Sequence, residues 1–248
     1  MVRPFAAALI ALAWALPSGA SGESVPPLKP MRTLVYSVQF SARTTNEEQS
    51  SGLRAAEAGV SAYGNAATQR VSNVDDSGTL TADVVAATGD DALVIDAAFT
   101  GKTVSQPRIR VAVYGDGRLS YAPERPLSPE AKRLLPLLAR GIVANRDVSS
   151  GSSWTIPAPA PVKGAYTYRV TASEGDTATL AIDVDLVVPG PRGFDEHGKA
   201  VARYDTARLC PTSYDYTGVS RHQPSMNQYV TTSSHLTAVL VSDTFAKP

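Results

Sequence analysis

The sequence predicts a mainly β protein of the α+β class, with antiparallel curved sheets or a half-barrel and one kinked helix near residues 128–144. Three observations predict this fold. Polar and apolar residues alternate with period two through most of the chain after residue 31, as in half-buried strands. Short turns that contain Gly and Asp separate these runs, as in antiparallel hairpins. One central segment has helical spacing and begins with a capping residue.

The N-terminus predicts export. Arg3 precedes an apolar run of 12 residues (5–16), and Ser18-Gly19-Ala20 offers small residues for cleavage, so residues 1–20 are typical of a signal peptide. The run is shorter than the roughly 20 apolar residues that span a membrane. We therefore expect no transmembrane anchor in the mature chain, a flexible lead at residues 21–30, and a periplasmic or extracellular location.

The first β region is expected at residues 31–125. Residues 31–42 alternate cleanly, whereas the pattern weakens over residues 43–76, where a helical turn at 53–58 is the only local signal. The remaining predicted strands of the region lie at 80–88, 92–99, 108–114 and 119–121, and turns containing Gly and Asp join the first two and the last two.

Residues 126–147 are expected to form a helical connector. Ser128 is a favourable N-cap, Pro129 suits the first helical position, and Glu130 suits the first turn. Leucines then give the segment an apolar side. Pro136 lies inside the helix and lacks the N–H that a helix interior needs, so we expect a kink or two short helices.

The second β region is expected at residues 148–248, either as a separate unit or as part of one continuous domain. Its clearest element is the hairpin at 166–186, followed by a break at 189–193, a polar turn at 194–199, and strands at 200–209, 213–219 and 228–245. The hairpin aligns with residues 84–96. Two interpretations remain open: two similar β halves, or two unrelated amphipathic hairpins with similar turns.

In this alignment Val84, Ala86 and Gly89 match Val170, Ala172 and Gly175 at one constant offset.

Charge and cysteine content exclude several classes of function. The chain holds 23 basic and 23 acidic residues, without blocks of like charge, so no nucleic acid or anionic membrane partner is expected. Cys210 is the single cysteine and cannot form an intramolecular disulfide. We expect it to be a buried small hydrophobic residue rather than a reactive thiol.

No motif in the sequence carries a known chemistry. Asp195-Glu196-His197 is the one cluster of acids with an imidazole, but adjacent residues point in different directions, so an exposed turn is favoured over a metal site. Neither a Gly-x-Ser-x-Gly elbow nor a glycine-rich phosphate loop occurs. We therefore assign no catalytic residue, no metal and no cofactor.

Aromatic residues in the predicted strands are the remaining candidates for a site. On one face of a sheet, aromatic side chains could line an apolar cavity, although ordinary core packing is favoured. The candidate ligand-binding residues are Tyr36, Phe40, Trp154, Tyr166 and Tyr168.

The order of features from residue 120 to 248 resembles that of uncharacterised exported bacterial β-proteins. These features are Ser153-Trp154-Thr155, the hairpin that begins Tyr166-Thr-Tyr-Arg-Val, and Phe194-Asp195 with Gly198 before the last strands. Such proteins are similar to the half-barrels of periplasmic lipoprotein carriers, which implies a curved antiparallel sheet around helices and an apolar groove. The resemblance transfers no catalytic residue, and the mid-chain helix departs from the continuous sheet of a carrier.

The leading hypothesis is an exported, non-enzymatic protein that binds an apolar small molecule, a lipid or a cell-envelope protein. Two alternatives remain open: a hydrolase-type enzyme whose groups meet only in three dimensions, and a structural module of the cell envelope. A deep pocket holding a histidine beside a carboxylate or a serine would favour the enzyme. A filled core with an exposed apolar patch or free sheet edge would favour the structural module.

Overall fold

The computed structural model describes residues 29–49, 67–88, 91–122, 124–190, 193–225 and 228–245. The expected signal peptide (1–20), most of the expected lead (21–30) and the expected helical turn at 53–58 lie outside these residues. Within the described ranges, no helix has both the length and the apolar character needed to cross a bilayer.

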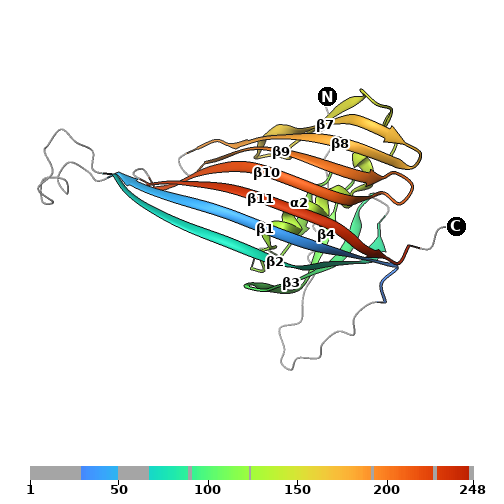
Figure 1. The fold of residues 1–248 in the computed structure, drawn as a ribbon, viewed down its shortest axis with the longest axis horizontal. Coiled ribbons are helices and arrows are strands. Elements are labelled where there is room, and N and C mark those ends of the chain that lie inside the picture. The colour runs from blue at the N-terminus through green and yellow to red at the C-terminus, as the bar shows by residue number, and fades with distance from the viewer. Residues whose placement is uncertain are drawn as a thin grey trace, which may run out of the picture.

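The described strands form one open antiparallel sheet of eleven strands (Figure 1). Its order is β5-β4-β3-β2-β1-β11-β10-β9-β8-β7-β6, so both predicted β regions belong to the same sheet. The prediction of a mainly β, antiparallel and curved fold is confirmed, and the sheet does not close into a barrel. The strands are β1 (Arg32–Gln49), β2 (Ala67–Ala87), β3 (Leu93–Gly101), β4 (Ser105–Val113), β5 (Leu119–Tyr121), β6 (Ser153–Pro157), β7 (Lys163–Glu174), β8 (Thr177–Val188), β9 (Phe194–Asp205), β10 (Cys210–Ser225) and β11 (Gln228–Asp243).

The helical segment connects the two edge strands, β5 and β6. Helix α2 (Pro129–Leu134) passes into two 3₁₀ helices, Leu135–Leu138 and Arg140–Ile142. The Ser128 hydroxyl accepts a hydrogen bond from the Ala131 N–H at 3.2 Å, which is the predicted N-cap. The predicted kink at Pro136 is confirmed, because the α-helix ends at Leu134 and Pro136 lies in the 3₁₀ helix that follows. Because β5 and β6 follow one another in the chain but lie at opposite edges of the sheet, a helical connector in the middle of the chain is compatible with one continuous sheet.

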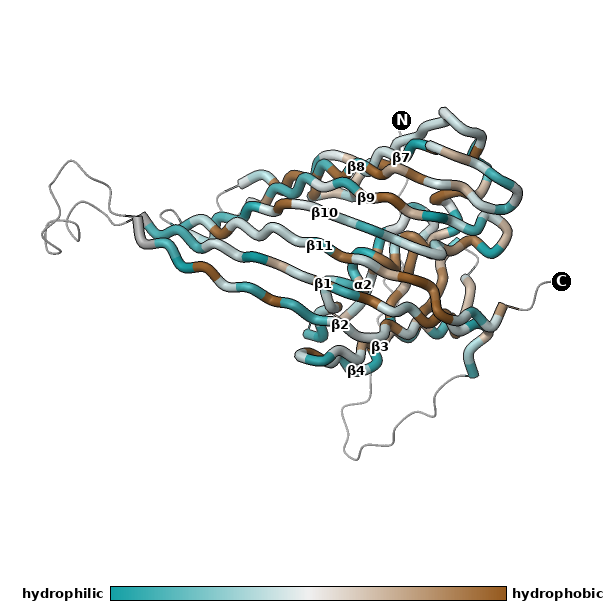
Figure 2. Tube along the Cα trace, in the orientation of Figure 1, coloured by the Kyte–Doolittle hydropathy of each residue, from teal (hydrophilic) through white to brown (hydrophobic). Residues whose placement is uncertain are grey.

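The core lies between the helical segment and one face of the sheet, here called the inner face. Tyr36, Leu80 and Leu180 point from the strands into this core, where they meet Leu134 and Ile142 of the helical segment, all at most 1% exposed. Figure 2 shows that hydrophobic residues gather in the half of the sheet that carries α2. The opposite face, here called the outer face, carries the alternate residues of each strand.

The weak pattern at residues 43–76 was misleading, because β1 continues to Gln49 and β2 begins at Ala67. These strand ends extend beyond the helical segment (Figure 1). Neither of their faces is covered by the core, so polar residues such as Thr44 and Thr45 stand on both faces. Alternation identifies a strand only when one of its faces is buried.

The two aligned hairpins, β2–β3 and β7–β8, share an irregularity. The register of β2 against β3 shifts between Val84 and Ala86, and that of β7 against β8 shifts between Val170 and Ala172. The sequence alignment pairs these same residues. A β-bulge is a fixed positional feature of a strand, so its recurrence supports a structural repeat whose two copies join in one sheet.

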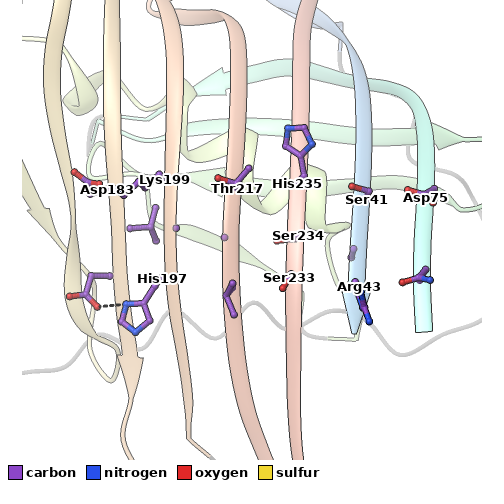
Figure 3. Close-up of a pocket in the computed structure, with 17 residues that line it drawn as sticks. Ser41, Arg43, Asp75, Asp183, His197, Lys199, Thr217, Ser233, Ser234 and His235 are labelled. Carbon is purple, nitrogen blue, oxygen red and sulfur yellow. Dashed lines mark ion pairs between the residues drawn. The ribbon is translucent and has the colours of Figure 1, made fainter. Parts of the chain in front are cut away.

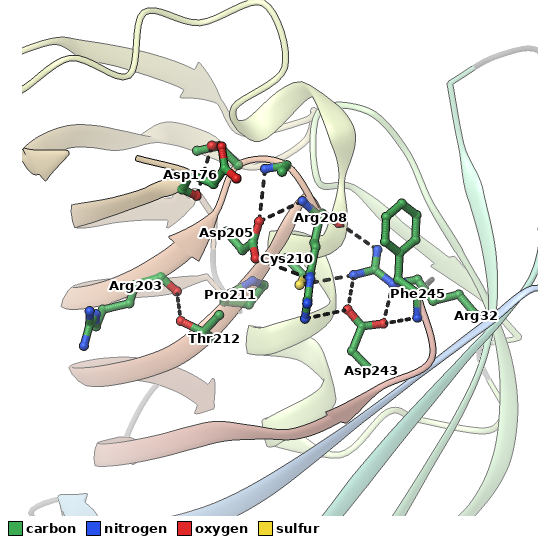
Figure 4. Close-up of polar contacts among 12 residues, drawn as sticks. Arg32, Asp176, Arg203, Asp205, Arg208, Cys210, Pro211, Thr212, Asp243 and Phe245 are labelled. Carbon is green, nitrogen blue, oxygen red and sulfur yellow. Dashed lines mark hydrogen bonds and ion pairs between the residues drawn. The ribbon is translucent and has the colours of Figure 1, made fainter. Parts of the chain in front are cut away.

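A polar cluster holds the two ends of the described chain together (Figure 4). Arg32 at the start of β1 donates two hydrogen bonds to Asp243 at the end of β11, from Nε at 2.9 Å and from Nη2 at 2.8 Å. Its Nη1 donates to the Arg208 carbonyl at 2.8 Å, and Nη2 also lies 3.2 Å from Sγ of Cys210. Cys210 is buried, and burial raises its pKa to about 11 despite the nearby Arg32 charge.

Candidate functional site

A groove of about 810 Å³ lies where the sheet fails to close, between its two edges and beside α2. One side is formed by the β4–β5 turn and β5, and the other by the segment after β6 and by the inner face of β7, β8 and β9. The apolar and aromatic residues that line it are Tyr114, Leu119, Tyr121, Pro129, Pro136, Pro157, Ala158, Pro159, Ala160, Val162, Tyr166, Leu186 and Phe194. The groove is therefore mostly apolar.

Buried polar side chains form the inner end of this groove. Strand β9 begins at Phe194, so Asp195, Glu196 and His197 lie in a strand, and the predicted polar turn at 194–199 is wrong. Pairing with both β8 and β10 extends the strand through these charged residues. As expected for neighbouring residues, the side chains alternate, and Glu196 alone of the three faces inward and is buried.

Glu196 is held by two partners on its inner side. The guanidinium of Arg133, from α2, donates from Nη1 to Glu196 Oε1, and the Tyr216 hydroxyl donates to the same oxygen at 2.9 Å. The Arg133 Cζ also lies 4.0 Å from the centre of the Tyr216 ring. Burial opposes the charge of Arg133, but the nearby carboxylate outweighs it, so the pKa of Arg133 is raised.

Two glycines allow Tyr216 to take this position. A Cβ at Gly218 would lie 1.9 Å from the Tyr216 hydroxyl oxygen, and a Cβ at Gly198 would lie 2.6 Å from the same ring. The Tyr216 ring therefore covers the paired glycines of β9 and β10 on the inner face. Burial raises the pKa of Tyr216, so its hydroxyl stays a hydrogen-bond donor.

Two further cations line the outer part of the groove. Arg118 is paired with Asp116, Nε to Oδ2 at 2.6 Å, and lies over the Tyr114 ring at 4.8 Å. Lys132, next to Arg133 on α2, is exposed and has no carboxylate within ion-pair distance among the described residues. The lining thus holds three cations and two carboxylates, and Lys132 supplies the uncompensated charge.

A second hollow, of about 830 Å³, lies on the outer face of β1, β2 and β8–β11 (Figure 3). It holds His197, whose Nδ1 lies 3.1 Å from Asp185 Oδ1, and His235, whose Nε2 lies 3.1 Å from Asp215 Oδ1. All four side chains are about half exposed or more. Within the described ranges, no three His, Cys, Asp or Glu residues are grouped as metal ligands.

The outer hollow brings histidines and carboxylates together, as the hydrolase alternative requires, but in an open setting where these side chains stay exposed to solvent. The strands that carry these pairs have hydrogen-bonded strands on both sides. Their backbone N–H groups are therefore used in the sheet and do not form an oxyanion hole. This arrangement favours the groove as the candidate binding site.

The sequence-predicted ligand residues lie in different places. Tyr166 lines the groove. Tyr36 and Tyr168 are buried in the core, at 1% and 3% exposed, and Trp154 stacks on Tyr168 with ring centres 5.6 Å apart. Phe40 is partly buried against the core, away from the groove. Sequence reasoning did not identify Lys132, Arg133 or Glu196 as site residues, since charge on a predicted helix or turn usually indicates a solvated face.

No family model and no curated protein matches the sequence. Among solved structures, a chain of lipovitellin, from work on lipid–protein interactions in that protein, is similar with a TM-score of 0.44 and 11% sequence identity. The match covers 90% of this chain and 26% of the lipovitellin chain, so this chain spans about a quarter of that protein's length.

Proposed function

We propose that this protein binds an apolar or amphipathic small molecule, such as a lipid, in the groove between its sheet edges. One observation carries the proposal: the gap between β5 and β6 is a groove of about 810 Å³ with mainly apolar walls. Sites for small ligands are typically clefts of about 300–1,000 Å³, lined mostly by apolar groups with a few polar groups. The groove has this size and this lining.

The N-terminal sequence supports the further proposal that binding takes place outside the cytoplasm. Residues 1–20 have the charged start, apolar run and small residues of a signal peptide. A periplasmic or extracellular binding protein would carry its apolar ligand through water. A cell-envelope protein is then a natural partner for delivery or uptake of that ligand.

An environment-sensitive apolar fluorophore, 1-N-phenylnaphthylamine, tests the proposal directly. It should bind the purified protein and become brighter, because the groove excludes water from its walls. Val162→Trp adds bulk to the groove lining and should weaken binding at least about tenfold. Val201→Trp introduces the same side chain on the outer face, where Val201 is 50% exposed, and should leave binding unchanged.

Equal affinity in both variants would place binding elsewhere, and a fluorophore that does not bind the wild type would refute the proposal. Native mass spectrometry of protein purified from its own host gives an independent reading. We expect a co-purified apolar molecule that is lost or reduced in Val162→Trp but retained in Val201→Trp.

A further inference from the structure

The inner end of the groove has unused capacity to bind an anion. Arg133 carries five N–H donors. Among the described residues, its side-chain hydrogen bond goes from one of them, Nη1, to Glu196. Its side chain lines the groove and is 23% exposed, so the remaining donors are not sealed in the core.

The position of this guanidinium is fixed before any ligand arrives. Glu196 holds one edge of it, and the Tyr216 ring lies against its face at 4.0 Å. Tyr216 is in turn held by its hydrogen bond to Glu196 and by the space that Gly218 leaves. A guanidinium fixed in this way loses little freedom on binding, which favours planar, two-oxygen acceptors such as a carboxylate.

Charge along the groove favours the same ligand. Glu196 compensates Arg133, and Asp116 compensates Arg118, so Lys132 leaves the lining with one net positive charge. Lys132 directly precedes Arg133 in the last turn of α2, and both side chains line the groove. A ligand with one negative charge would balance the groove, whereas a cationic head would meet both Lys132 and Arg133 and be repelled.

We infer that the groove selects an anionic amphiphile of the fatty-acid class, with its carboxylate at Lys132 and Arg133 and its hydrocarbon chain against the apolar lining. This inference rests on the proposed function, because it names the head group of the ligand that the groove binds. Leu186 and Tyr166 lie on the inner face beside Glu196, so chain and head would contact neighbouring parts of one surface.

Three compounds with the same chain and different heads test the inference: oleate, oleyl alcohol and oleylamine, each below the concentration at which it aggregates in water. Their affinities are measured by displacement of 1-N-phenylnaphthylamine at pH 8. We expect oleate to bind at least about tenfold more tightly than oleyl alcohol, and oleylamine to bind most weakly. Oleyl phosphate distinguishes the head class, and tighter binding of this dianion than of oleate would overturn the assignment of a carboxylate.

Lys132→Met removes the uncompensated charge from an exposed position and should fold normally. In this variant oleate should lose at least about tenfold in affinity, while oleyl alcohol should bind as in the wild type. Lys199→Met is the matched control, because Lys199 is also exposed but lies in the outer hollow. It should change neither affinity.

Failure of the inference and failure of the proposed function give different results. If the three heads bind equally, or if Lys132→Met weakens oleyl alcohol as much as oleate, the anionic selectivity is wrong and an apolar groove remains. If neither the fluorophore nor any of the three compounds binds, the proposed function itself is wrong.

Discussion

The pairing of Arg32 with Asp243 should contribute a large share of the stability of this sheet. The pair joins the start of β1 to the end of its neighbour β11, the central strand of the sheet, through two hydrogen bonds of 2.8–2.9 Å. The Asp243 side chain is 2% exposed and that of Arg32 is 15% exposed (Figure 4). Asp243→Ala therefore leaves a largely buried guanidinium without its carboxylate.

Removing one partner of a buried ion pair costs about 3–5 kcal/mol. Arg32 keeps its hydrogen bond to the Arg208 carbonyl and some contact with solvent, which lowers the expected cost. We expect Asp243→Ala to reduce the free energy of unfolding by about 2–4 kcal/mol at pH 7. Asp185→Ala, at an exposed pair with His197, should cost less than about 1 kcal/mol.

The pH dependence of this loss identifies its cause. Burial opposes ionisation of Asp243, but the hydrogen bonds and charge of Arg32 outweigh burial, so the pKa of Asp243 lies below its usual value. An unfolded aspartate has a pKa of about 3.9. A lowered folded pKa stabilises the protein above that value, and the stabilisation is lost as the pH falls through the folded pKa.

Urea unfolding followed by circular dichroism measures both quantities. The difference between wild type and Asp243→Ala should be constant from about pH 8 to pH 5 and should shrink below about pH 4. A loss below about 1 kcal/mol at pH 7, or a difference unchanged in acid, would refute this account of the pair.

Three further outcomes follow from other sites. Gly218→Ala should lower the free energy of unfolding in urea by about 1–3 kcal/mol, because the added Cβ would overlap Tyr216. Adding Tyr216→Phe to this variant should recover part of that loss, since the closest overlap is with the Tyr216 hydroxyl. Asp76→Ala should increase hydrogen exchange at residues 102–104, whose N–H groups donate to its carboxylate at 2.9–3.0 Å; unchanged exchange would contradict this. Cys210 should react with a disulfide reagent at pH 8 only after unfolding, because burial raises its pKa to about 11.

Local chemistry determined how much of the fold could be predicted. The N-cap at Ser128, the kink at Pro136 and the turn at Gly175 each depend on a few neighbouring residues, so the sequence identified them. The strand ends near Thr44 could not be recognised in this way. Both of their faces are free of the core, so no alternation of polar and apolar residues is required.

The charged end of the groove was beyond sequence reasoning for another reason. Arg133 and Glu196 are 63 residues apart, and one is on a helix while the other is in a strand whose start looked like a polar turn. Their proximity depends on the order of strands in the sheet, which places β9 opposite α2. The one local signal is the pair Gly198 and Gly218, because glycines inside strands often mark close approach of another group.

The opening of the sheet and the lining of the groove have a common cause in the edge strands. β5 has three residues and β6 has five, and β6 ends at Pro157, with Pro159 soon after. Proline has no N–H to donate to a neighbouring strand, so this edge cannot extend its ladder to meet β5. Pro157, Pro159 and Pro129 of α2 all line the groove. The prolines that end β6 therefore also supply an apolar wall of the groove with no N–H group to satisfy, which suits a hydrocarbon chain lying between the two edges.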